Sequence, residues 1–255
     1  MSVHQVAQQG FGAGAERYQR SRPSYPPDAV AWLVESLRIG PDATALDVAA
    51  GTGIFTRLLA PHGARLIAVE PVEAMRRRFT ATVPGVPVVS GVAEAMPFAG
   101  GTIDAITIAQ AFHWFDGQRA PRELHRVLRP GGRMGLLWNT RDRSVDWVDA
   151  LWSIIDRYER DAPWGGQSKW RERAFVETPW FGELHEATFR HEQVLTPELV
   201  VERMLGVSHV AVLQPAEQQE VAAEVRAVLA AHPATRDRAT VAIPYRVDVY
   251  WRERR

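Results

Sequence analysis

The chain of 255 residues contains no cysteine. This absence excludes a disulfide framework, a zinc site built from thiolates and a cysteine nucleophile together. Lysine is nearly absent as well, because Lys169 is the only lysine among 30 basic residues. We give that bias no functional weight. The chemistry of the protein therefore does not depend on a thiol.

Long apolar runs are also missing. Nowhere do about 18 apolar residues follow one another, as a membrane-spanning helix requires. Residues 1–26 lack the basic and then apolar layout of a signal peptide. We therefore expect a cytoplasmic protein with no membrane partner.

Neither sign of charge is in excess. Lysine plus arginine equals aspartate plus glutamate at 30 each, so no overall field favours a polyanion. Apolar residues make up 46% and charged residues 24%, which is typical of globular chains. We expect a monomer or homodimer that does not bind nucleic acid.

Short apolar runs alternate with segments of helical period over residues 44–138. This order is typical of βαβ units that form a parallel sheet in an α/β fold. Two later segments alternate as long strands and suit an antiparallel edge. The predicted strands are Thr44–Val48, Arg65–Val69, Val86–Val89, Ile103–Ile108, Arg133–Trp138, Leu184–Leu195 and Val241–Trp251.

Length favours one domain over residues 1–255. Pro27 and Asp28 open a helix that reaches about Arg38, and later segments of helical period surround the two late strands. The predicted organisation is an N-terminal cap and first helix (1–43), a core (44–140), helical lid elements (141–183 and 196–240) and late strands (184–195 and 241–251).

A glycine turn follows the first strand, in the sequence Asp47-Val48-Ala49-Ala50-Gly51-Thr52-Gly53. Glycines let the backbone approach a ligand closely, although they often serve only a tight connection. Glu70 ends the next strand, where a carboxylate can accept both hydroxyls of a ribose. Asp47 is expected to accept hydrogen bonds from the turn or to face a ligand ammonium group. Together these residues predict a nucleoside site.

A nicotinamide-dinucleotide site follows the same logic. Its fingerprint requires a third glycine, where this chain has Phe55 and Thr56. It also requires no aspartate at the end of the strand. An oxidoreductase therefore remains the less favoured alternative.

The turn resembles that of the class I S-adenosylmethionine-dependent methyltransferases, D-x-G-x-G-x-G, with Ala49 in place of the first glycine. A methyl group is expected to be tolerated there where φ stays negative. Further matches follow in the family's order: Ala68-Val69-Glu70-Pro71 with Met75, Gly91 to Phe98, Asp104 to Phe115 and Val127 to Arg133.

This resemblance implies a Rossmann-like three-layer sandwich whose mostly parallel seven-stranded sheet has an antiparallel edge strand and a helical lid insertion. It implies S-adenosylmethionine as cofactor, S-adenosylhomocysteine as product and a small-molecule methyl acceptor. The cofactor residues that it implies are Asp47, Ala49, Gly51, Gly53, Glu70, Pro71, Met75, Ala93, Glu94, Ala109 and Gln110.

Within the family the chain most resembles the trans-aconitate methyltransferase-like, or type 11, group, whose N-terminal pattern is similar to residues 11–26. The resemblance implies that Tyr18, Arg22 and Tyr25 close over the cofactor, with Arg22 near its carboxylate. Plainer alternatives remain open. Tyr18 and Tyr25 would then only pack the N-terminal segment, Met75 would fill the core and Glu94 would be a solvated loop residue.

His113 follows the fourth strand near the expected acceptor. It is the first candidate for a general base or orienting donor, against a structural role beside Trp114. Asn139 and Arg141 follow the fifth strand and, with His113 and Trp114, are candidate substrate contacts. An acceptor carboxylate would pair with Arg141 or Arg22. A non-catalytic cofactor-binding protein of the same fold remains an alternative.

Overall fold

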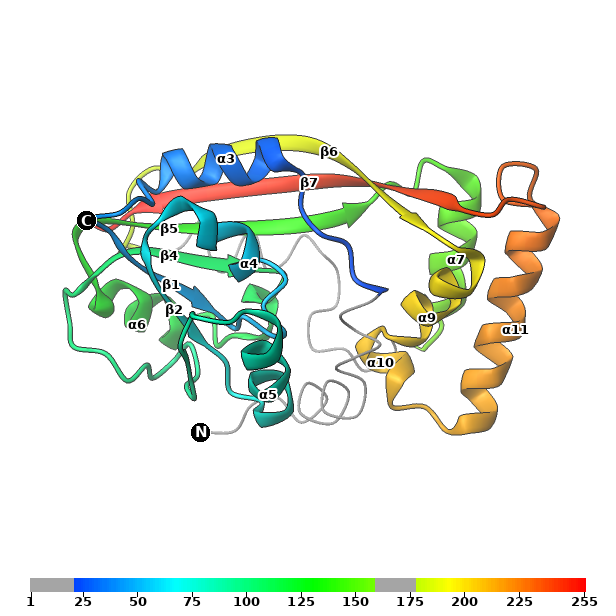
Figure 1. Ribbon diagram of the computed structural model, residues 1–255, viewed down its shortest axis with the longest axis horizontal. Helices are drawn as coiled ribbons and strands as arrows, with labels where there is room; N and C mark the ends of the chain where they lie inside the picture. The colour runs from blue at the N-terminus through cyan, green and yellow to red at the C-terminus, as the bar shows by residue number, and fades with distance from the viewer. Residues whose placement is uncertain (1–20, 159–177) are drawn as a thin grey trace. The chain divides into compact units, whose positions relative to one another are not determined.

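The computed structural model describes residues 21–158 and 178–255. Its seven strands form one sheet in the order β3-β2-β1-β4-β5-β7-β6 (Figure 1). The strands are β1 (Thr44–Val48), β2 (Arg65–Val69), β3 (Val88–Val89), β4 (Ile103–Ala109), β5 (Leu128–Arg141), β6 (His185–Leu195) and β7 (Val241–Glu253). The helices that the text uses are α3 (Pro27–Ser36), α4 (Thr56–Leu59), α5 (Glu73–Thr82), α6 (Arg119–Val127), α7 (Asp146–Asp156), α9 (Pro197–Leu205) and α11 (Pro215–Ala231).

The first five strands are parallel. β1 pairs with β2 on one side and with β4 on the other, β2 pairs with β3, and β4 pairs with β5. Their apolar runs are buried on both faces, as expected for a parallel sheet covered by helices. The carboxyl ends of β1, β2 and β4 therefore open on the same edge.

β7 runs antiparallel to its neighbours (Figure 1). The Asp142 amide donates to the Pro244 carbonyl over 3.0 Å, and the Arg254 amide donates to the Gly132 carbonyl over 2.8 Å. From the first bond to the second, the residue number falls along β5 and rises along β7, which is the pattern of antiparallel strands. The predicted Rossmann-like sheet, mostly parallel with an antiparallel pair at one edge, is confirmed.

Alternate residues along each central strand face opposite layers. In β4, Ala105 packs with the cluster that contains α3, whereas Ile106 packs with the cluster that contains α6. In β5, Leu136 and Leu137 divide between the same two clusters. This alternation follows from the period of two in a strand and produces the three layers.

Two strands begin more than one residue away from their predicted starts. β3 begins at Val88 rather than Val86, because Pro87 has no N–H to donate to a neighbouring strand. β5 begins at Leu128 rather than at Arg133, since Leu128 pairs with Ile103 of β4 ahead of a register shift in that ladder. Both differences arise from backbone hydrogen bonding rather than from side-chain pattern.

The chain divides into two compact units. Of the described residues, the sheet unit comprises 25–139, 178–189 and 247–255, and the helical unit comprises 21–24, 140–158 and 190–246. β5, β6 and β7 contribute residues to both units. The single domain predicted for residues 1–255 stays a prediction, as does a lid role for the helical elements.

The helical unit has its own apolar core. Trp152 of α7, Met204 of α9 and Val225 of α11 are fully buried in one cluster. α9 begins where the Thr196 hydroxyl accepts the Leu199 amide over 3.3 Å, a standard N-cap. No helix in the described ranges is long and apolar enough to cross a membrane.

Candidate functional site

The turn after β1 bends through three residues with positive φ: Ala49 at 57°, Gly51 at 59° and Gly53 at 83°. The expectation that φ stays negative at Ala49 is therefore wrong. An alanine in this left-handed region costs about 1–2 kcal/mol, which a glycine would avoid. The turn keeps its shape despite that cost because it is bonded to the next strand, where the Ala50 amide donates to the Val69 carbonyl over 3.2 Å.

The two glycines of the turn have different surroundings. A Cβ atom at Gly51 would meet no atom within 4 Å, whereas one at Gly53 would lie 2.3 Å from Cγ2 of Val83 and 2.9 Å from Cδ2 of Phe79. Gly53 is required for the packing of the turn on α5. Beside Gly51 the backbone borders open space, and a ligand needs such space to approach the turn closely.

Glu70 joins the turn after β1 to the end of β2. Its Oε2 accepts the Gly51 amide over 2.9 Å and its Oε1 accepts the Val72 amide over 2.8 Å. The side chain is only 5% exposed, and this burial raises the pKa of Glu70 above its ordinary value, against the two amide hydrogen bonds. Each carboxylate oxygen has two lone pairs, so Glu70 retains capacity for further donors.

Asp47 lies deeper and binds two hydroxyl groups. Its Oδ2 accepts from Thr56 over 2.5 Å and its Oδ1 accepts from Thr107 over 3.1 Å. Asp47 is 1% exposed, and burial raises its pKa to about 6 although both hydroxyls oppose the rise. We expected Asp47 to accept a hydrogen bond from an amide of the turn. The Gly51 amide of the turn donates to Glu70 instead, so this role belongs to Glu70. Asp47 instead ties β1 to α4 and β4.

The titration of Asp47 predicts a pH-dependent stability. Its pKa in the folded state, about 6, exceeds the value of about 4 in an unfolded chain, so between these pH values the folded state binds more protons. The free energy of unfolding therefore falls as pH rises from 4 to 6, by roughly 2 kcal/mol from this group. Urea unfolding of the wild type and Asp47→Asn from pH 4 to pH 7 measures this, because groups common to both proteins cancel. Parallel stability profiles would contradict the prediction.

Further predicted cofactor residues lie on α5 and in the loop that follows β3. Met75 of α5 is 3% exposed and Ala93 is 3% exposed. The Glu94 carboxylate accepts the Asp116 amide over 2.8 Å, which joins the loops that follow β3 and β4. The Arg76 guanidinium donates to the carbonyls of Glu70 and Pro71 over 2.8 and 2.7 Å and fixes the start of α5.

The loop after β4 carries the cofactor candidate Gln110 and the acceptor-side candidates His113 and Trp114. Gln110 follows Ala109 with φ at 58°, and its Nε2 donates to the Asn139 carbonyl over 3.3 Å. His113 lies in a short 3₁₀ turn, Phe112–Trp114, with its ring 5.2 Å from that of Trp114. Gln110 and Asn139 are thus brought together, and His113 and Trp114 are adjacent and half-buried.

The remaining candidates separate between the units. Tyr25, in the sheet unit, is 7% exposed and packs edge-on against Phe55 at 5.2 Å. Arg22 belongs to the helical unit, where its Nη2 donates to the Gly206 carbonyl over 3.1 Å. Arg141 also belongs there and approaches Asp156 at 3.8 Å. Tyr18 lies outside the described residues.

Several polar residues of the turn region were not predicted from the sequence. Thr56 and Thr107 bind Asp47. Thr52, between the two glycines, is 1% exposed and its hydroxyl has no partner among the described residues. Its position inside the motif could have identified it, and an unpartnered buried hydroxyl beside open space fits a polar ligand.

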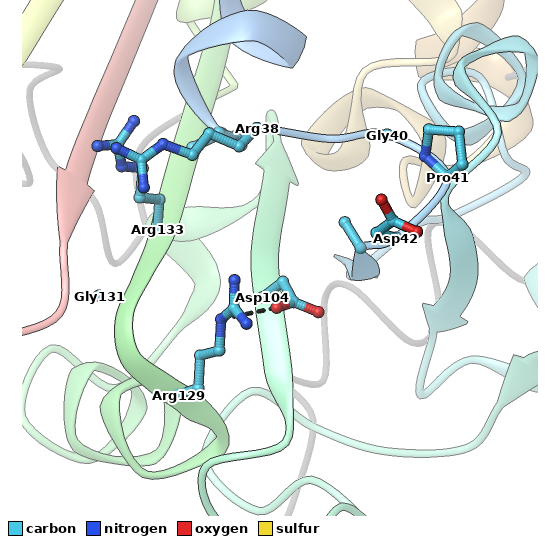
Figure 2. A pocket seen from close by; sticks show the side chains of 10 residues that line it. Arg38, Gly40, Pro41, Asp42, Asp104, Arg129, Gly131 and Arg133 are labelled. Carbon is cyan, nitrogen blue, oxygen red and sulfur yellow. Dashed lines mark ion pairs between the residues drawn. The ribbon is translucent and has the colours of Figure 1, made fainter.

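A pocket of about 200 Å³ lies at the opposite, amino-terminal edge of the sheet (Figure 2). Asp104, near the start of β4, pairs there with Arg129 over 2.7 Å and accepts the Thr44 amide over 2.7 Å. These contacts satisfy the carboxylate and explain it as a structural residue. The pocket is not the site predicted by the motifs, which follow the carboxyl ends of the strands.

No cluster of three histidine, aspartate or glutamate side chains arranged to hold a metal ion occurs in residues 21–158 and 178–255. The arrangement at the carboxyl ends of β1 and β2 is a different kind of site. It offers an open backbone turn, a buried carboxylate with free lone pairs and a buried hydroxyl. Such a set suits a neutral or cationic group rich in hydroxyls, as in a nucleoside.

Comparison with known proteins identifies the family. Residues 46–136 match the family model described as a methyltransferase domain. An uncharacterized methyltransferase of Mycobacterium tuberculosis is 36% identical over 236 residues, which cover 92% of this chain and 91% of that protein. A malonyl-[acyl-carrier protein] O-methyltransferase of Methylococcus capsulatus is 42% identical over 164 residues, or 58% of this chain and 56% of its own length.

Solved structures agree on the fold. The YcgJ protein of Bacillus subtilis superposes with a TM-score of 0.56 at 17% identity, covering 89% of this chain and 98% of its own. The matched residues 46–136 contain the glycine turn, Glu70 and the loop after β4. The chain therefore belongs to the class I S-adenosylmethionine-dependent methyltransferases of the type 11 group.

Proposed function

We propose that the protein transfers a methyl group from S-adenosylmethionine to a small-molecule acceptor, with the cofactor held at the carboxyl ends of β1, β2 and β4. The observation that carries the proposal is the hydrogen bond from the Gly51 amide to Glu70. It draws the carboxylate after β2 against the glycine turn after β1, which is where open α/β sheets bind nucleosides.

Each part of the cofactor has a candidate partner in the sheet unit. The lone pairs that remain on Glu70 accept from the ribose hydroxyls, and the open backbone at Gly51 adjoins the methionine part, with Gly53 shaping the turn. Met75, Pro71, Ala93 and Glu94 surround the adenine, and Ala109 and Gln110 adjoin the ammonium group. Asp47 acts at a distance, by holding Thr56 and Thr107 and thus the end of β1.

When bound, S-adenosylmethionine supplies an electrophilic methyl group on a positively charged sulfur. The task of this chain is then to align the acceptor with that methyl and to exclude water, an effect of proximity and orientation. His113 accepts a proton from the acceptor or orients it, and Trp114, Asn139 and Arg141 contact the acceptor. Only an acceptor that starts protonated needs the base.

The acceptor is proposed to be methylated on oxygen, at a carboxylate or a hydroxyl. The O-methyltransferase among the relatives supports oxygen as the methylated atom. The comparisons give no support to the oxidoreductase alternative. A cytoplasmic location, a monomer or homodimer and the absence of a nucleic-acid partner stay predictions.

The test combines binding and turnover. Calorimetry with S-adenosylhomocysteine is expected to give one site per chain, and NADH is expected not to bind. A screen of oxygen acceptors then measures the release of S-adenosylhomocysteine, with His113→Ala as the variant that tests the base. Binding without turnover across the screen would favour a non-catalytic protein. Full activity of His113→Ala would remove His113 from the mechanism.

A further inference from the structure

An arginine lies inside the core of the helical unit. Arg203 of α9 is 6% exposed, and its helix neighbours Val200, Val201 and Met204 are 0%, 3% and 0% exposed. Arginine is almost never buried to this extent unless it is paired with an anion. The burial of Arg203 therefore requires an explanation.

No anion among the residues that the structure describes supplies one. Nε and Nη1 of Arg203 have no hydrogen-bond partner within residues 21–158 and 178–255, and Arg203 makes no ion pair there. Its guanidinium lies over the ring of Trp152 at 5.8 Å. A cation–π contact contributes modestly, whereas a buried charge without a counter-ion is strongly unfavourable.

The neighbouring charges are matched among themselves. Arg141 lies over the same Trp152 ring at 5.3 Å and approaches Asp156 at 3.8 Å. Arg143 pairs with Asp149 over 2.5 Å and with Asp156 over 2.6 Å. Two arginines thus share two aspartates. Within the part of the chain that the structure describes, Arg203 is then the positive charge near Trp152 that has no carboxylate partner.

The geometry points to Arg203 as the residue that binds a carboxylate of a small organic-acid ligand, beside the ring of Trp152. A guanidinium fork matches a carboxylate with two parallel hydrogen bonds. One unmatched positive charge is neutralised by one carboxylate, whereas a phosphate monoester would bring about −1.5 to −2. This site lies within the helical unit, and the carboxylate role predicted for Arg22 or Arg141 passes to Arg203.

The experiment compares organic acids with neutral counterparts. Calorimetry and thermal unfolding are run with citrate, succinate and phenylacetate at millimolar concentration, against phenylacetamide, inorganic phosphate and sodium chloride at equal ionic strength. At least one acid is expected to bind the wild type and to raise its Tm, since a ligand that binds only the folded state stabilises it. Phenylacetamide and chloride are expected to have no such effect.

Three variants locate the binding. Arg203→Met, which keeps an unbranched apolar stem beside Trp152, is expected to lose affinity for the acid by about 10- to 100-fold, and Arg203→Lys to lose less. Arg226→Met is the matched control, because Arg226 pairs with Glu198 on the surface of the same unit and is 54% exposed. This control is expected to bind the acid as the wild type does. Arg203→Lys keeps the test valid if the methionine variant fails to fold.

The outcomes separate this inference from the proposed function. If none of the acids binds the wild type, if Arg203→Met binds as tightly, or if only phosphate depends on Arg203, the carboxylate site is overturned. S-adenosylhomocysteine binding is measured in parallel and is expected to be the same in Arg203→Met. Failure of the wild type to bind S-adenosylhomocysteine overturns the proposed function alone.

Discussion

Replacing Glu70 with alanine is expected to weaken the binding of S-adenosylhomocysteine by about 100-fold. Two hydrogen bonds from ribose hydroxyls to a buried carboxylate contribute about 3 kcal/mol together, since bonds to a charged group are the strong ones. Alanine also removes the acceptor for the Gly51 and Val72 amides, so the turn loses its connection to β2. Calorimetric titration below the unfolding temperature of both proteins measures the loss.

The matched control for this substitution is Glu73→Ala. Glu73 lies three residues away at the start of α5, with its side chain 70% exposed and paired with Arg77 on the next turn. Exposed pairs of this kind contribute little, so the affinity should not change. Unchanged affinity in Glu70→Ala itself would refute the ribose role of Glu70.

Gly53→Ala is expected to lower the free energy of unfolding by roughly 2–5 kcal/mol. About 1–2 kcal/mol comes from an alanine at a φ of 83° and the rest from overpacking against Val83 and Phe79, which are 3% and 0% exposed. Gly51→Ala, at a φ of 59° with open space around the added methyl, should lose only about 1–2 kcal/mol. Urea unfolding of the two variants gives the difference.

A double-mutant cycle distinguishes overpacking from backbone strain. Val83→Ala removes the Cγ2 atom that would lie 2.3 Å from the new methyl. The cost of Gly53→Ala should therefore be smaller by about 1 kcal/mol or more in the Val83→Ala background. Equal costs in the two backgrounds, or equal losses in Gly51→Ala and Gly53→Ala, would contradict the packing argument.

The parallel strands could be predicted closely because their signals are local. β1 and β2 have the predicted bounds, Thr44–Val48 and Arg65–Val69, since each is a short apolar run between turn residues. The length of β5 depends instead on backbone pairing with Ile103 of β4 at its start and, near its end, with β7, which is more than a hundred residues away in the sequence. Such pairing leaves no mark on the side-chain pattern of either strand.

The residues of the site also fall into those that local sequence predicts and those that depend on distant pairing. The glycine turn and Glu70 were predictable because the motif lies within one βαβ unit. The partners of Asp47 were not, because Thr107 is 60 residues away and meets Asp47 only when β4 pairs with β1. The sign of φ at Ala49 was also hidden, since it depends on how the turn is held by β2. Arg203 had a visible signal, a charge beside Met204 and three residues after Val200 on an apolar helix face.

The two outer strands of the sheet bear on how copies of this chain behave at high concentration. A long, flat and apolar outer strand would recruit strands from other molecules and begin aggregation. β3 has only two residues and offers almost no backbone for such recruitment. β6 is eleven residues long, but Glu186, Arg190 and Glu192 project exposed from it. Charges of both signs along that rim disfavour intermolecular strand pairing and help to keep the chain in solution.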